Sequence, residues 1–116
     1  MILQDILDKL KEVDERTFFG VVKRNVKETL WNYIVFERIK KTYNENKTSV
    51  VDVYAIHIVR EGWIEDEVIE EAIKKVLEIK GMKIASEGTY DYSVKPNTDT
   101  VVEMFSIEFT KSKKVV

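Results

Sequence analysis

The period of the hydrophobic pattern changes several times along the chain, and each change predicts a different element. Apolar residues recur at helical spacing over residues 2–14 and again over 66–80, which predicts two amphipathic helices. In the second helix acidic residues gather at the start and lysines at the end, an order that complements the helix dipole. Gly81 follows at the position where a left-handed residue would close this helix.

Runs of β-branched and aromatic residues predict the strands. We expect them at residues 17–22, 30–36, 50–60, 82–85, 89–94 and 100–110. The run at 50–60 is apolar on both faces, so it should be a central strand covered on each side, or covered on one side by a partner subunit. The Asn- and Lys-rich segment 42–49 predicts an exposed loop, and residues 110–116 are expected to be frayed.

This order of elements favours one fold class. Strands in direct succession favour antiparallel pairing, and two helices can cover one face of such a sheet. We therefore predict an α+β fold with a mainly antiparallel sheet of about four to six strands and two helices packed on one face. The 116 residues should form a single domain, residues 1–116.

Composition narrows the possible partners. The chain is 44% hydrophobic and 34% charged, a globular balance, and its formal charge of −2 gives no strong attraction to nucleic acid or an anionic membrane. It has no cysteine, which excludes disulfides and thiolate metal sites. Asp5 and Asp8 interrupt the start, and no apolar run reaches the length of a membrane span. We expect the protein to stay in the cytoplasm where it is made.

No group of residues predicts catalysis. His57 is the only histidine and lies among valines, so we interpret it as a packed or hydrogen-bonded core residue rather than a metal ligand. No serine lies in a Gly-x-Ser-x-Gly elbow, and the acids of 65–71 suit a helix start. Four glycines are too few for a phosphate-cradling loop or a dinucleotide fingerprint. The sequence therefore predicts no enzyme, no metal and no cofactor.

Aromatic residues and the single proline indicate possible contact surfaces. Trp31 and Tyr33 belong to a set of aromatics larger than one small core needs, and Trp and Tyr are enriched where subunits meet. An ordinary core role is an equally good interpretation. Pro96 lies in the polar link Lys-Pro-Asn-Thr-Asp-Thr between two predicted strands, where it either ends a strand or stiffens a protruding hairpin.

Three segments carry a resemblance to a known family. They are "LWNYIVFER", "NKTSVVDVYAIHIVREGWI" with the following helix and "IKGMKIA", and "YDYSVKPNTDTVVEMFSIEFTK". In this order they resemble the small tail-completion proteins, or tail terminators, of long-tailed bacteriophages and prophages of Gram-positive bacteria. The resemblance implies an α+β subunit that forms a ring, usually a hexamer, on the tail tube, stops its growth and offers a surface to the head connector. It implies no enzymatic activity and no cofactor.

The resemblance also implies partners and contact residues. The partners would be further copies of the chain, the tail tube protein and the head–tail connector proteins, with DNA at most passing through the ring. The protein would assemble in the host cytoplasm and end in the virion tail. Residues expected at subunit or tail-tube contacts are Trp31, Tyr33, Lys95, Pro96, Asn97 and Asp99. The alternatives are a head-completion or neck protein, a monomeric protein-binding module and, last, an enzyme that relies on carboxylates.

Overall fold

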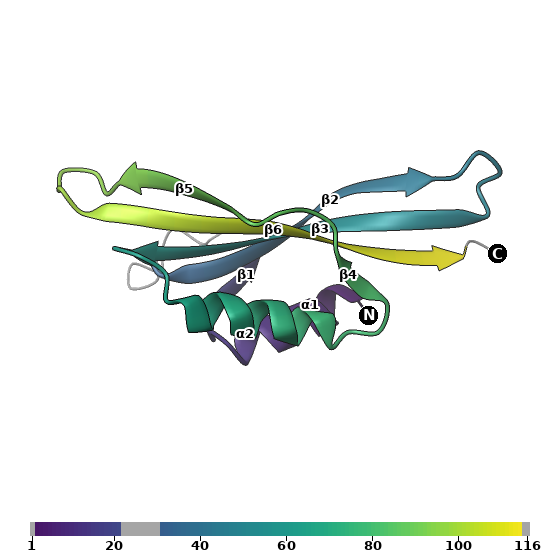
Figure 1. Cartoon of the computed structure of the whole chain (residues 1–116), viewed down its shortest axis with the longest axis horizontal. Coiled ribbons are helices and arrows are strands. Elements are labelled where there is room, and N and C mark those ends of the chain that lie inside the picture. Colours follow the sequence, from purple (N-terminus) through teal and green to yellow (C-terminus); the bar gives the residue numbers. More distant parts are fainter. Residues whose placement is uncertain (1, 22–30, 115–116) are drawn as a thin grey trace.

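The computed structural model describes residues 2–21 and 31–114 and confirms the predicted α+β class. Two helices lie on one side of a six-stranded sheet whose pairs are antiparallel except for the parallel pair β1–β2 (Figure 1). The elements in chain order are α1 (Ile2–Lys11), β1 (Thr17–Phe19), β2 (Tyr33–Tyr43), β3 (Ser49–Glu61), α2 (Asp66–Leu77), β4 (Met82–Ile84), β5 (Thr89–Val94) and β6 (Val101–Lys114).

The sheet has the order β1-β2-β3-β6, and two short strands share the far edge of β6. β4 pairs with the second half of β6, from Phe109 to Lys111, and β5 pairs with the first half, from Val101 to Ser106. β3 pairs over its full length with β6 and is therefore central, as its apolar sequence predicts.

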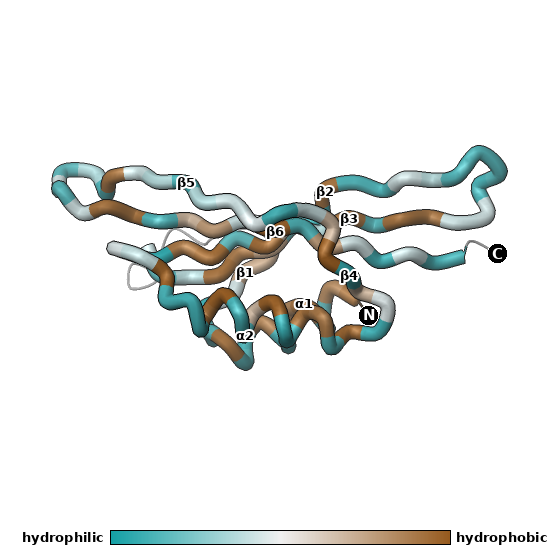
Figure 2. Tube along the Cα trace, viewed as in Figure 1, coloured by the Kyte–Doolittle hydropathy of each residue, from teal (hydrophilic) through white to brown (hydrophobic). Residues whose placement is uncertain are grey.

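The sheet is longer than the helices that support it. The molecule measures 53 × 28 × 25 Å, and a hairpin projects past the helices at each end (Figure 1). We call the β5–β6 hairpin, with its turn at 95–100, the proline hairpin, and the β2–β3 hairpin, with its turn at 44–48, the asparagine hairpin. Both turns are hydrophilic, while the strands above the helices are largely hydrophobic (Figure 2).

The core lies between the helices and one face of the sheet, which we call the covered face. Ile6 and Leu10 of α1 and Val76 of α2 are completely buried against it. The covered face contributes Ile34, Phe36, Tyr54, Ile56, Ile58, Phe105, Ile107 and Phe109. On the opposite, uncovered face lie the alternate residues of the same strands, such as Tyr33, His57 and Ser106, and neither helix packs there.

The strand expected at 30–36 is much longer than the pattern predicts. β2 begins at Tyr33 and continues to Tyr43, so the loop expected at 42–49 is only 44–48. Residues 37–43 are mostly charged and polar, but they pair with β3, and Lys41 forms an ion pair with Asp52 at 2.5 Å. The strand expected at 17–22 is observed as β1, which ends at Phe19. Val22, the last residue of that expected strand, and Leu30, the first residue of the strand expected at 30–36, lie outside the described residues.

The prediction that residues 110–116 are frayed is wrong for 110–114. This segment continues β6 and pairs with Ser49–Val53 of β3. Asp52 of β3 lies between β2 and β6, 3.9 Å from Lys113 as well as close to Lys41, so charge complementarity offsets the polar composition. Residues 115–116 lie outside the described part of the chain.

Both helices end earlier than their hydrophobic pattern. α1 ends at Lys11 and α2 at Leu77, where Glu78 is the C-cap. Gly81 has the left-handed φ of +86° that was expected, but it shapes the turn into β4 rather than closing the helix. Over residues 2–21 and 31–114, neither helix is long and apolar enough to cross a membrane.

Candidate functional site

The tip of the proline hairpin is a defined turn. The Lys95 carbonyl accepts hydrogen bonds from the Thr98 N–H at 3.1 Å and from the Thr98 hydroxyl at 2.8 Å. Asn97 has a φ of +63°, so Pro96 and Asn97 occupy the two central positions of a type II turn, which favour these residues. Pro96 therefore both ends β5 and shapes the tip.

Lys95 has a contact that holds the base of this tip. Its ammonium group donates to Glu61 at the end of β3 at 2.7 Å, and its N–H donates to the Thr100 carbonyl at 2.9 Å. Asp99 is exposed beside it. The turn is thus tied to the sheet, so ordering it on binding would cost little conformational entropy.

Trp31 and Tyr33 lie at the same end of the molecule, on the uncovered face. The register places Tyr33 opposite Val59, Val59 opposite Met104, and Met104 opposite Asp91 of β5. These residues, with Trp31, line a shallow hollow whose remaining walls are Tyr92, Ser93 and Val102. Burial raises the pKa of the Tyr33 phenol. The hollow and the hairpin tip are neighbours along β5, but they are not one site.

The structure adds apolar side chains that the sequence did not single out. Val94 and Val101 flank the hairpin turn and are exposed, as are Tyr90 and Tyr92 on β5. Trp63, in the loop after β3, is 73% exposed. The sequence around it, Gly62-Trp63-Ile64 before a run of acids, does not distinguish it from the buried Ile64.

A buried carboxylate fixes the position of β5 against the rest of the fold. Glu103 of β6 accepts hydrogen bonds from the Tyr92 hydroxyl at 2.7 Å and from the Ile64 N–H at 2.8 Å. The bond to Glu103 raises the pKa of Tyr92. The aromatic strand β5 is therefore held in register and tied to the loop that leads into α2.

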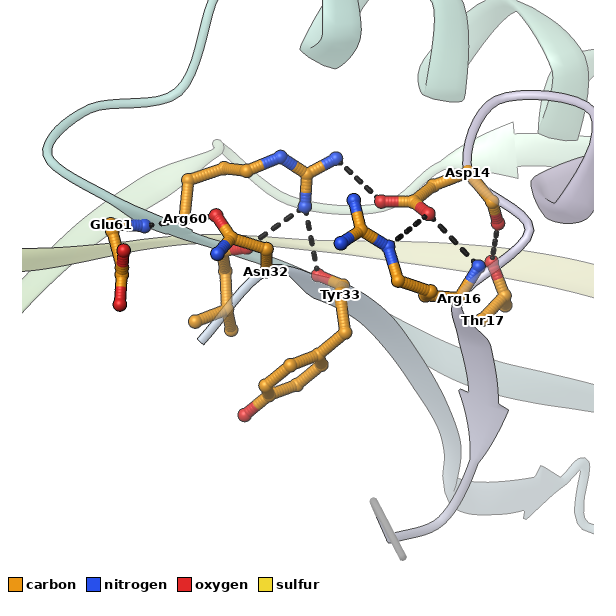
Figure 3. Close-up of polar contacts among 8 residues, drawn as sticks. Asp14, Arg16, Thr17, Asn32, Tyr33, Arg60 and Glu61 are labelled. Carbon is orange, nitrogen blue, oxygen red and sulfur yellow. Dashed lines mark hydrogen bonds and ion pairs between the residues drawn. The ribbon is translucent and has the colours of Figure 1, made fainter. Parts of the chain in front are cut away.

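A second carboxylate positions the start of β2 (Figure 3). Asp14 is buried and accepts from the Arg16 N–H at 2.9 Å, from the Arg16 Nε at 3.2 Å and from the Arg60 guanidinium at 2.7 Å. Arg60 also donates to the Tyr33 carbonyl at 3.3 Å. The network thus connects the segment after α1 to the strand that places Tyr33 in the hollow.

The uncovered face also carries a polar network in its middle. His57 is hydrogen-bonded through Nδ1 to the Ser106 hydroxyl at 2.7 Å and through Nε2 to Glu37 at 2.8 Å. These three groups contain a hydroxyl, a base and an orienting carboxylate, but Ser106 lies between two paired strands, so its backbone groups belong to the sheet ladder. We interpret the network as cross-strand hydrogen bonding. His57 is thus hydrogen-bonded, but it lies on the uncovered face with its side chain 20% exposed rather than in the core expected from its sequence context.

Residues 2–21 and 31–114 contain no group of three or more His, Cys, Asp or Glu side chains placed to hold a metal ion. The carboxylates at the start of α2 follow the helix dipole.

Comparisons with known proteins identify the fold. No model of a known protein family matches the chain, and no curated protein sequence matches it. Its structure is similar to the crystal structure of the type 4 fimbrial biogenesis protein PilO from Pseudomonas aeruginosa, with a TM-score of 0.55. The match covers 98% of this chain and 67% of that chain at 12% sequence identity. At this identity the similarity shows the α+β fold alone.

Proposed function

We propose that the chain is a structural subunit of a bacteriophage tail: a tail terminator that forms a ring on the head-proximal end of the tail tube and ends its growth. The observation that supports it is the concentration of exposed apolar side chains at the proline-hairpin end, namely Tyr90, Tyr92, Val94 and Val101. These residues share the helix side of the sheet with Phe105 and Glu103, whereas the aromatic hollow lies on the opposite face of the same strands. An exposed patch of this kind suits a contact surface better than a solvated one. The partners that we propose for this surface are inferred from the sequence resemblance to tail terminators.

The proposed role is non-enzymatic and needs no cofactor. In this role Trp31 and Tyr33 contact another copy or the tube, while Lys95, Pro96, Asn97 and Asp99 present a preformed hairpin tip. The partners are further copies of the chain, the tail tube protein and the connector proteins. The ring forms in the host cytoplasm and remains in the virion tail. Preformed turns favour such contacts because little chain entropy is lost on binding.

The first test is deletion of the gene from the phage or prophage that carries it, followed by electron microscopy of the particles. The proposal predicts tails of irregular or excessive length that are not joined to heads. Tails of normal length beside filled, unjoined heads would instead establish the neck alternative. Intact, infective particles would contradict both the terminator and the neck hypothesis and favour a protein-binding module.

A complementation test addresses the aromatic hollow. In the deleted phage, a chain carrying both Trp31→Ala and Tyr33→Ala should fail to restore finished tails although it folds. The matched control is Leu77→Ala, which removes an exposed apolar side chain from α2 and should restore them. If both variants complement equally, Trp31 and Tyr33 are not contact residues.

The two hairpin tips provide a matched pair for the turn residues. Asp99→Lys reverses a charge at the proline hairpin, and Glu45→Lys makes the same change in the turn of the asparagine hairpin. We expect only the first to impair tail completion. Equal effects, or none, would remove the hairpin tip from the proposed contact surface.

A further inference from the structure

Several strand edges of this sheet have no partner in the described part of the chain, and the two longest belong to β5 and β2. β5 pairs with β6 on one side, and no described strand pairs with its other side. β1 pairs with β2 only at residues 34–36, so the outer edge of β2 from Glu37 to Tyr43 is also open. Both edges present backbone N–H and C=O groups that a further strand could pair with.

The edge of β5 lacks the features that usually protect such strands. Residues 89–94 contain no proline and no lysine, and all six are exposed. Two tyrosines and a valine favour strand pairing, and Asp91 is the only charge. An unprotected edge of this length is a site where another chain adds a strand.

The open edge of β2 has the opposite charge. It carries Arg38, Lys40 and Lys41 against the single acid Glu37, which is bound to His57. Two β2 edges would repel one another because of these charges. An acidic strand such as β5, with Asp91 and nearby Glu87, complements this edge.

The strand directions agree with this pairing. β3 is antiparallel to both β2 and β6, so β2 and β6 run the same way; β5 is antiparallel to β6 and therefore to β2. Two copies in the same orientation can thus bring β5 of one copy against β2 of the next as an antiparallel pair, with all helices on the same side, provided that the second copy is shifted along the strand direction. The shift is needed because β5 lies beside the first half of β6, whereas the open segment of β2 is level with the second half. The lengths match, since β5 has six residues and the open segment of β2 spans seven, of which Ile39 lies in a β-bulge.

We propose that β5 of one copy pairs with the outer edge of β2 of the next, which joins the subunits into one continuous sheet. Asp91 and Lys40 both point to the uncovered face, because their partners Met104 and Val53 belong to it, so they can lie opposite one another across the contact. The contact joins unlike edges and therefore repeats from copy to copy, which gives a ring when the rotation between copies closes. This inference deepens the proposed function and rests on it for the existence of a ring.

Disulfide trapping tests the pairing directly, since the chain has no cysteine of its own. Purified Asp91→Cys and Lys40→Cys chains are mixed at high concentration and oxidised. The expected product is a mixed 91–40 disulfide, and a chain with both changes should form a ladder of multimers, because opposed strand positions lie within disulfide reach.

The control pairs Asp91→Cys with Glu70→Cys, which lies on the exposed side of α2. If 91–70 disulfides form as readily as 91–40, or if 91–91 dimers dominate the mixture, the pairing of β5 with β2 is wrong.

A charge swap tests the same contact in assembled tails. In the deleted phage, Asp91→Lys and Lys40→Asp should each lower the yield of finished tails by about tenfold or more, and a chain carrying both should restore it, because the swapped charges again face each other. Glu70→Lys is the control for net charge. Two single variants that complement fully, or a double variant no better than either, would overturn the assignment.

The two proposals fail in different ways. If 91–40 trapping succeeds but the deleted phage makes normal tails, the proposed function is wrong and the strand pairing stands. If the deleted phage makes overlong tails but trapping fails, the terminator function stands and its ring uses another surface.

Discussion

The two faces of the sheet are built from the same strands but have different roles: one packs against the helices and the other does not. On β3, Ile56 and Ile58 face the helices and are 2% and 1% exposed, while His57 between them points to the other side and bonds to Glu37 and Ser106. The covered face is apolar throughout its centre, whereas the uncovered face combines a polar network with an aromatic hollow. The difference indicates that packing on one face stabilises the fold and leaves the other free for contacts.

The comparison is tested most strongly by neighbouring residues of β2. Phe36 is buried on the covered face, so Phe36→Ala should lower the free energy of unfolding by about 3–5 kcal/mol. Val35 points to the uncovered face, and Val35→Ala should cost about 1 kcal/mol or less. Denaturant unfolding of both variants measures the difference. Equal losses would mean that the uncovered face is packed as tightly as the covered one.

The next largest effect concerns Asp14, which joins the covered core to the start of β2. Asp14→Asn removes the negative charge between Arg16 and Arg60 and should destabilise the fold by about 2–3 kcal/mol. Arg16 is partly exposed, so Arg16→Ala should cost less than about 1 kcal/mol. Thermal unfolding of both variants measures these losses. A larger loss for Arg16→Ala than for Asp14→Asn would mean that Arg16, and not Asp14, is the costly residue to change in this network.

Gly88 tests how closely the connection between β4 and β5 crosses the core. A Cβ at this position would clash with the ring of Phe105, so Gly88→Ala should cost about 1–3 kcal/mol through overpacking. In a chain that already carries Phe105→Leu, Gly88→Ala should cost less stability than it does in the native chain, because the smaller side chain leaves room for the added methyl group. Additive losses in a double-mutant cycle would show that the contact is relieved by other movements.

The smallest effect concerns pH and the tie between β5 and the fold. The hydrogen bond to Glu103 raises the pKa of Tyr92, so the folded state favours the neutral phenol. This contribution is complete below the ordinary tyrosine pKa of about 10 and is lost as the pH rises through the higher folded value.

Glu103→Gln removes the carboxylate but keeps an oxygen for the Ile64 N–H. Absorbance titration of tyrosinate should then show one tyrosine ionising at lower pH than in the native chain, and Tyr92→Phe should remove that component. A curve that Glu103→Gln leaves unchanged would contradict the assignment.

Periodicity predicted the elements whose residues face a core on one side. α2 and β3 were found from the spacing of their apolar residues, and the tip at Pro96 follows from the chemistry of proline and asparagine in turns. The second half of β2 and the end of β6 were missed because Glu37–Tyr43 and 111–114 carry charges. Their strand structure comes from pairing with β3, which local sequence does not report.

The candidate site could be predicted only in part. The residue types of Trp31 and Tyr33 indicate a contact surface, but the hollow they line needs Val59, Met104 and Asp91 from three other strands. A slip of one residue in any strand would turn its side chains to the other face, so the site depends on a register that the sequence alone does not determine.

The projecting hairpins have a mechanical consequence. Each lies beyond the helices, so it lacks the second layer that stiffens the middle of the sheet (Figure 1). Ribbons of two or three strands twist over a wider range than sheets held by a packed layer. The two hairpins can therefore twist to follow the curvature of a neighbouring molecule, while the helix-backed centre of the sheet keeps its shape.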